Sequence, residues 1–157
     1  WFVYPDRTVD DRTRIQLGGR ELILQAHPTA HTSNDLTVRD PDTGTWWLGD
    51  LLFVDRMPTL DGSLTGWRKV LDRLDDRAAK RVVPGHGPPA VAWPKAARPL
   101  EAYLKDLEQQ VRSALDQGQT LTDVVLAAQR REDPDWALFK RVHPRNVSKA
   151  YTELEWQ

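Results

Sequence analysis

The chain has 157 residues, with 22 Lys or Arg against 23 Asp or Glu, so its formal net charge is −1. This length fits one domain with a sizeable core, and the balanced charge gives no basic field for nucleic acid. The absence of cysteine excludes disulfides and thiolate zinc sites, and without a run of about eighteen apolar residues we expect no membrane-spanning segment.

The first part of the chain has the pattern of paired β-strands. Gly18-Gly19 separates two segments of alternating apolar and polar residues, which is typical of a β-hairpin because glycine adopts positive φ readily. A second turn is indicated by Asp40-Pro41-Asp42-Thr43-Gly44. Residues 1–4 are expected to be a strand or the stub of one. We therefore expect two hairpins, with strands at 14–17, 21–25, 36–39 and 45–48.

A helix and a further strand follow these hairpins. Ser63 can cap a helix over 64–76. The apolar residues of this segment recur at helical spacing: Leu64, Trp67, Val70, Leu71 and Leu74. Residues 80–83 are expected to form a strand that leads to His86. The order strand, helix, strand predicts an α/β (α+β) fold in which helices cover a sheet.

After Pro88-Pro89 the pattern becomes helical. Gly118 is well placed to end one helix, and Thr120 to cap the next. Asp133-Pro134 is expected to interrupt the chain, and Pro144 is expected to begin a new helix. The sequence thus predicts a helical last third, with helices over 100–115, 121–131, 136–142 and from 144 onward.

Three residues that could bind a metal lie beside turns or strand ends. They are His31 in Ala30-His31-Thr32-Ser33-Asn34-Asp35-Leu36, Asp50 in Gly49-Asp50-Leu51-Leu52-Phe53 and His86 in Pro84-Gly85-His86-Gly87. Their separations of 50 − 31 = 19 and 86 − 50 = 36 residues fit ligands that tertiary structure brings together. Imidazole nitrogen and carboxylate oxygen together suit zinc, and also iron or manganese.

In this order the three motifs resemble the second half of a metallo-β-lactamase-fold hydrolase. The resemblance implies that His31 binds the first metal, that Asp50 is catalytic and bridges two zinc ions, and that His86 binds the second metal. It also implies hydrolysis of an ester, thioester, lactone or β-lactam by a metal-bound hydroxide, with a small molecule as substrate. An aspartate at position 50 resembles broad hydrolases such as glyoxalase II more than many true β-lactamases.

Two later segments narrow this resemblance. His143-Pro144-Arg145-Asn146-Val147 and Tyr151-Thr152-Glu153-Leu154-Glu155-Trp156 look similar to the quinoprotein-associated zinc metallohydrolases. That subfamily implies a periplasmic setting. His143, Arg145 and Asn146 could reach a substrate, but a structural role at a helix start is favoured.

The main signature of the family, His-x-His-x-Asp-His, is absent from the 157 residues. We therefore expect the chain to be the C-terminal half of a longer protein. Residues 1–92 would form the C-terminal half of an αββα sandwich, and residues 93–157 a helical C-terminal appendage. Half a sandwich would expose an apolar sheet face, so the expected partner is the missing N-terminal half or a second copy of the chain, in a homo-oligomer.

Two functions from different classes remain open. In the first, the chain is part of a zinc-dependent hydrolase and is inactive alone, because three ligands shared between two metals make incomplete sites and zinc would be absent or partial. In the second, the chain is a non-catalytic binding or scaffold domain. Asp35 is expected to be a loop hydrogen-bonder or a support for a metal ligand, and His27 a strand-end residue. Trp46, Trp47 and Trp67 are expected in the core.

Overall fold

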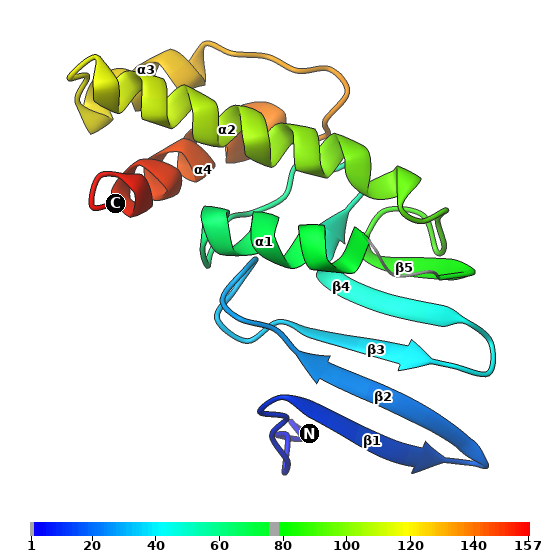
Figure 1. Ribbon diagram of the computed structural model, residues 1–157. Helices are drawn as coiled ribbons and strands as arrows, with labels where there is room; N and C mark the ends of the chain where they lie inside the picture. Colours follow the sequence, from blue (N-terminus) through cyan, green and yellow to red (C-terminus); the bar gives the residue numbers. More distant parts are fainter. Residues whose placement is uncertain (1, 76–78) are drawn as a thin grey trace.

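The computed structural model describes residues 2–75 and 79–157 of the chain (Figure 1). Within these ranges the chain forms one five-stranded sheet with the order β1-β2-β3-β4-β5. Neighbouring strands from β1 to β4 pair antiparallel, whereas β4 and β5 pair parallel. The strands are Arg12–Leu17 (β1), Arg20–Ala26 (β2), Leu36–Asp40 (β3), Thr45–Phe53 (β4) and Arg81–His86 (β5).

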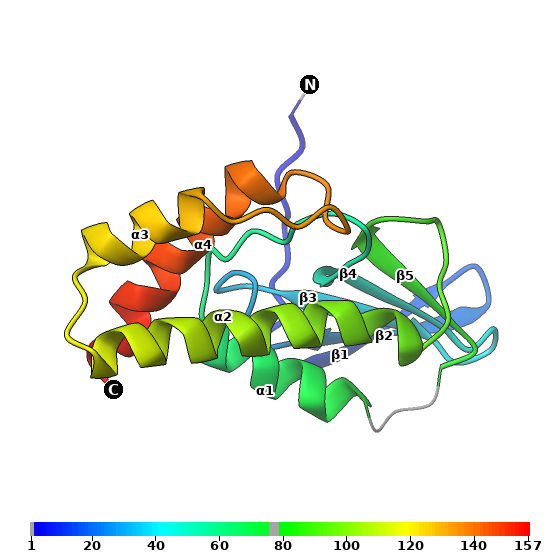
Figure 2. The ribbon, with the colours of Figure 1, turned by 90° about the horizontal axis from the view of Figure 1, so that it is seen from above.

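Four α-helices accompany this sheet in the described residues. α1 lies against one face of the sheet, and α2 runs alongside α1 (Figures 1 and 2). α3 and α4 pack on each other, and α4 also packs on α2, so these helices form a cluster at one end of the sheet (Figure 2). The α/β fold predicted from the sequence is confirmed. The helices are Leu64–Asp75 (α1), Arg98–Asp116 (α2), Leu121–Gln129 (α3) and Phe139–Leu154 (α4).

The local signals in the sequence explain most element boundaries. Gly18 and Gly19 both have positive φ between β1 and β2, as the hairpin requires. The Ser63 hydroxyl accepts a hydrogen bond from the Gly66 amide at 2.9 Å and so caps α1. Thr120 and Asp123 form a reciprocal capping box at the start of α3.

The predicted helix boundary at Pro144 is wrong. α4 begins at Phe139 and continues through Pro144, while Trp136 and Leu138 lie in a turn before it. Leu138 has a left-handed φ of 68°. A proline inside a helix costs a backbone hydrogen bond, but the buried side of α4 continues across it. That side includes Phe139, His143, Asn146, Val147 and Ala150. Packing of this side against the rest of the chain outweighs the local cost.

The core lies between α1 and the sheet, next to β4. Trp67 is fully buried, and its Nε1 donates a hydrogen bond to the Leu51 carbonyl oxygen at 3.0 Å. Burying an indole with its N–H paired adds apolar contact without leaving a polar group unsatisfied. This packing fixes β4 relative to α1, and β4 carries Asp50.

The opposite face of the sheet has no described helix against it (Figure 2). The strand register places Trp47, Val38 and Leu24 side by side on this face, and Ile15 beside Leu22 follows on β1 and β2. Trp47 is 39% exposed, in contrast to Trp46 at 5%. The expectation that Trp47 lies in the core is therefore wrong, because consecutive strand residues point to opposite faces.

Other differences concern the ends of predicted segments. Residues 2–9 form no strand, and Trp1 lies outside the described residues. The helix predicted over 64–76 is confirmed from Leu64 to Asp75, and residue 76 lies outside the described residues. Among residues 2–75 and 79–157, no helix combines the length and apolar character needed to cross a membrane.

Candidate metal centre

Asp50 and His86 form the closest pair among the three predicted ligands. His86 Nε2 lies 3.5 Å from Asp50 Oδ1, and the two side chains are 40% and 41% exposed. His86 also stacks on the Phe53 ring, with centroids 4.7 Å apart and planes inclined by 28°. The pair therefore comes from the adjacent parallel strands β4 and β5, with both groups open to solvent.

The backbone around this pair depends on two glycines. Gly49 has a φ of 54°, and the pairing of β4 with β5 shifts register on both sides of it. On β5, a Cβ at Gly85 would overlap with Asp50 Oδ1 and would lie 2.7 Å from the Gly49 carbonyl carbon. Glycine is therefore required at position 85 for β5 to approach Asp50 this closely.

His31 lies in the loop between β2 and β3 and is almost fully buried, with 7% exposure. Its Nδ1 is 3.4 Å from Asp35 Oδ1, and its Nε2 is 3.2 Å from Thr59 Oγ1. The ring also packs against Phe53 and Trp67, at centroid distances of 5.6 and 5.3 Å. Both ring nitrogens thus have polar neighbours.

The protonation of Asp35 indicates where His31 carries a proton. Burial raises the pKa of Asp35, but hydrogen bonds from His31 and Thr32 lower it, and the net pKa is below its ordinary value. The carboxylate is then ionised at neutral pH and can only accept hydrogen bonds. His31 Nδ1 therefore carries a proton that faces Asp35, and Nε2 lies 3.2 Å from the Thr59 hydroxyl. A histidine whose Nδ1–H faces a carboxylate has the arrangement found in many metal-ligating histidines.

Two of the three predicted ligands, His31 and His86, pack against Phe53, but the three do not form a common site in the described residues. The Phe53 ring contacts both His31 and His86. Within the described part of the chain, however, no three His, Cys, Asp or Glu side chains are placed to hold a metal ion. The structure thus brings Asp50 and His86 together and leaves His31 engaged with Thr59.

Sequence reasoning did not identify Thr59 as a neighbour of His31. Thr59 is 28 residues away in sequence, and an isolated threonine in a loop carries no local signal. Asp35 was considered as a support for a metal ligand, and the structure places it beside the His31 ring.

The donor set at Asp50 and His86 fits part of a zinc site. A carboxylate oxygen and an imidazole nitrogen are both common zinc ligands, but tight structural sites use four protein ligands and catalytic sites usually three. The close approach allowed by Gly85 keeps these two donors adjacent. Two adjacent donors can contribute to a zinc site but do not complete one.

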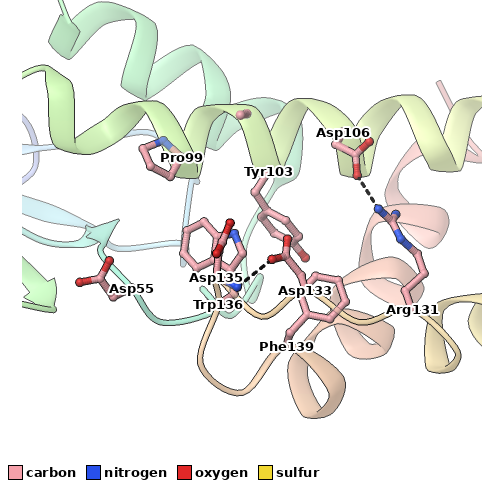
Figure 3. Close-up of a pocket in the computed structure, with 10 residues that line it drawn as sticks. Asp55, Pro99, Tyr103, Asp106, Arg131, Asp133, Asp135, Trp136 and Phe139 are labelled. Carbon is pink, nitrogen blue, oxygen red and sulfur yellow. Dashed lines mark hydrogen bonds and ion pairs between the residues drawn. The ribbon is translucent and has the colours of Figure 1, made fainter.

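One hollow in the described structure is separate from this pair. A cavity of about 420 Å³ lies between α2 and the segment before α4 (Figure 3). Tyr103 and Trp136 lie near its centre, and Arg131 pairs with Asp106 at one end, with N and O atoms 3.2 Å apart. His31, Asp50 and His86 are not among the described residues that line it. The cavity therefore belongs to the helical part of the chain.

Comparison with known families gives this site its context. The family model of the metallo-beta-lactamase superfamily matches residues 1–86, which is more than half of the chain. The chain belongs to the metallo-beta-lactamase superfamily. The matched residues include His31, Asp50 and His86, and members of the superfamily usually bind zinc.

Solved structures show the same superfamily fold. A metallo-beta-lactamase from Pontibacter korlensis is 27% identical to this chain, with a TM-score of 0.57. The alignment covers 64% of this chain and 49% of the Pontibacter chain. A metallo-beta-lactamase family protein from Thermus thermophilus is 18% identical with a TM-score of 0.69, covering 94% and 47%. A beta-lactamase domain protein from Burkholderia ambifaria is 17% identical with a TM-score of 0.71, covering 98% and 48%.

This superfamily chain thus spans about half the length of each of these three solved chains. The Thermus and Burkholderia structures align over nearly the whole chain, so the likeness extends to the helical part. A search of curated proteins found no match.

Proposed function

We propose that this chain supplies half of the metal centre of a zinc-dependent hydrolase that acts on an ester, thioester, lactone or β-lactam. The observation that carries the proposal is the Asp50–His86 pair, with its two donor atoms 3.5 Å apart on adjacent strands. The match of residues 1–86 to the metallo-beta-lactamase superfamily supports hydrolysis as the chemical class.

The residues of this chain would hold and orient the metal centre. Asp50 has two carboxylate oxygens and could contact two metals, as the family resemblance implies. His86 would hold one of them, and its stacking on Phe53 restrains the imidazole plane. His31 would hold the other through Nε2, which now lies 3.2 Å from the Thr59 hydroxyl. Bound zinc would supply a Lewis acid that lowers the pKa of water to about 7.

The remaining ligands would come from outside this chain. This chain aligns with less than half of each of the three related solved chains. Its described residues contain no set of three ligands placed to hold a metal ion. We propose that an N-terminal half with the His-x-His-x-Asp-His signature, or failing that a second copy, covers the apolar sheet face and completes the centre. The boundary between a sandwich half at 1–92 and a helical appendage at 93–157 is part of the same proposal.

Zinc retention tests this proposal directly. Elemental analysis would follow dialysis of the chain against a weak chelator, for the wild type and for Asp50→Ala and His86→Ala. We expect the wild type to retain zinc only when the covering partner is present, and either substitution to reduce it. Asp55→Ala is the matched control, because Asp55 follows β4 by two residues and lies in the separate cavity.

Two results would contradict the assignment. The first is equal zinc content in the wild type, Asp50→Ala and His86→Ala complexes. The second is unchanged hydrolysis by the complex with Asp50→Ala, since the proposed site would then be irrelevant to turnover.

A non-catalytic binding or scaffold role is the second candidate for the isolated chain. The incomplete ligand set within the described residues favours it. Hydrolase assays on the isolated chain and on the completed complex would separate the two roles. Activity only in the complex supports the half-site, and robust activity of the 157 residues alone would overturn inactivity of the isolated chain.

We further assign the chain, as a proposal, to the quinoprotein-associated zinc metallohydrolases and to the periplasm. The segment His143-Pro144-Arg145-Asn146-Val147 supports the subfamily, and it lies within α4. Cell fractionation of the whole protein would check the compartment, and recovery from the cytoplasm would contradict it.

A further inference from the structure

A loop between β4 and α1 connects the last helix of the chain to the buried histidine of the candidate centre. The loop is held from the helical side by Asn146 on α4, which has no exposed surface. Asn146 Oδ1 accepts a hydrogen bond from the Leu60 amide at 3.0 Å, and Asn146 Nδ2 donates to the Pro58 carbonyl oxygen at 2.7 Å. One side chain therefore fixes the backbone on both sides of Thr59.

The same loop encloses His31 on its other side. The Thr59 hydroxyl lies 3.2 Å from His31 Nε2. The Asp61 and Gly62 amides donate to the His31 carbonyl oxygen at 3.1 and 2.6 Å. The loop thus contacts both the ring and the backbone of His31.

Asn146 is itself held in one orientation. Its Nδ2 also donates to the Tyr103 hydroxyl on α2 at 3.0 Å. The amide group therefore makes three hydrogen bonds in a buried setting, where an alternative orientation would leave polar atoms unpaired. This fixes which end of the amide faces Pro58 and which faces Leu60.

We propose that Asn146 is a positioning residue for His31, acting through the loop 58–60 and the Thr59 hydroxyl. Its two bonds to the loop hold Thr59 at His31 Nε2, while Asp35 holds Nδ1. The His31 ring is then held in one orientation, with Nδ1 facing Asp35 and Nε2 facing Thr59, before any metal binds. The claim that these contacts prepare His31 for a metal rests on the proposed role of His31 as a ligand. The contacts themselves are independent of that role.

Side-chain ¹⁵N NMR of the metal-free chain tests the proposal. The chain has four histidines, His27, His31, His86 and His143, so a His31→Gln spectrum assigns the His31 signal. In the wild type we expect a single His31 signal with a proton held on Nδ1. In Asn146→Ala and in Thr59→Val we expect that signal to be lost to an average of both tautomers.

A double variant shows whether Asn146 acts through Thr59. Asn146→Ala combined with Thr59→Val should change the His31 signal no more than Thr59→Val alone. Additive changes would mean that Asn146 affects His31 by another route and would overturn the proposal.

Val147→Ala is the matched control. Val147 is the next residue on α4 and is fully buried, but its side chain makes no hydrogen bond to the loop. It therefore weakens the packing of the same helix while Asn146 and Thr59 remain. We expect the His31 signal of Val147→Ala to match the wild type. A change as large as that in Asn146→Ala would show general loosening of the helix instead of positioning.

If Asn146→Ala does not fold, Asn146→Asp decides the question. When it is ionised, Asp keeps an acceptor for the Leu60 amide but cannot donate to the Pro58 carbonyl oxygen, so the spectrum is recorded at alkaline pH. We expect a partial shift toward the averaged His31 signal. A folded Asn146→Asp with the wild-type signal would overturn the proposal.

The two proposals fail separately. Loss of the wild-type His31 signal in these variants, together with no zinc retention by the completed complex, would leave a held histidine that is not a ligand. Normal zinc retention with an unaffected His31 signal would instead reject only the positioning role.

Discussion

Gly85 on β5 is packed directly against Asp50 on β4, so closely that position 85 has no room for a side chain. A Cβ there would overlap with Asp50 Oδ1 and would lie 2.8 Å from the Asp50 backbone nitrogen. The Asp50 side chain could rotate away, but the backbone contact would remain. The separation of the two parallel strands at the candidate centre is therefore set by this glycine.

Gly85→Ala should push β5 away from β4 and separate His86 from Asp50. We expect loss of zinc retention in the completed complex and a destabilisation of about 1–3 kcal/mol, which is the usual cost of overpacking. Elemental analysis and urea unfolding would measure the two effects. Gly18→Ala is the control: its positive φ makes alanine unfavourable, but nothing lies within 4 Å of the added Cβ. Equal zinc retention in Gly85→Ala and wild type would contradict the role of this contact.

Glu153 on α4 caps the start of α1 from a distant part of the chain. Its carboxylate accepts hydrogen bonds from the Leu64 amide at 2.7 Å, the Ser63 hydroxyl at 2.8 Å and the Thr65 hydroxyl at 2.7 Å. Negative charge is favourable at a helix N-terminus. Glu153→Gln should reduce the free energy of unfolding by about 1.5–3 kcal/mol, the range for hydrogen bonds to a charged group. Urea unfolding at pH 7 would measure this.

The same residue predicts a dependence on acid. Burial raises the pKa of Glu153, but the hydrogen bonds from Thr65, Leu64 and Ser63 lower it, with a net decrease. Because the folded pKa is below the unfolded one, this stabilisation is present above about pH 4.5 and is lost as the pH falls through the folded pKa. The stability difference between wild type and Glu153→Gln should therefore shrink below pH 4.5. A stability difference that stays constant as the pH falls below 4.5 would contradict this role of Glu153.

The sequence predicted the parts of the fold that depend on local signals. The glycine pair at Gly18-Gly19 and the cap at Thr120 each act through neighbouring residues, and both are found in the structure. Pro144 misled the prediction because tertiary packing of α4 outweighs the local cost of proline. The position of Trp47 was missed because which sheet face is covered depends on elements far away in sequence.

The sequence predicted candidate ligands for the centre, but it did not predict their geometry. The motifs identified His31, Asp50 and His86, and the structure places two of them 3.5 Å apart. The neighbours of His31 could not be read from the sequence. Thr59 is 28 positions from His31 along the chain, and Asn146 is 86 positions from Leu60, whose amide it binds. Contacts between residues so far apart in sequence form only when the chain folds.

His143 should make the chain less stable in mildly acidic solution. Its Nδ1 lies 3.3 Å from the Tyr103 hydroxyl, and its Nε2 is buried without a partner among the described residues. Burial, with a smaller effect from Arg131, lowers the pKa of His143 to about 4. The unfolded chain takes up this proton near pH 6.5 and the folded chain does not, so stability falls between about pH 6.5 and 4. The full loss would be about 3 kcal/mol.

NMR and unfolding experiments check this prediction together. The His143 imidazole should remain neutral at pH 5 in the folded chain. His143→Leu should reduce the loss of stability between pH 6.5 and 4. A titration of His143 near pH 6.5 in the folded chain, or an unchanged pH dependence in His143→Leu, would contradict it.

The uncovered face of the sheet should make the isolated chain self-associate. Trp47 and Ile15 are 39% and 37% exposed on this face, which is apolar across several strands. Exposed apolar patches of this kind favour association with another surface. We expect light scattering at tens of micromolar to show dimers or larger species, and Trp47→Lys with Ile15→Lys to shift the chain toward monomer. Trp156→Lys is the control, because Trp156 is 83% exposed but follows α4. A monomeric wild type, or equal effects of the sheet and control substitutions, would show that this face is not the associating surface.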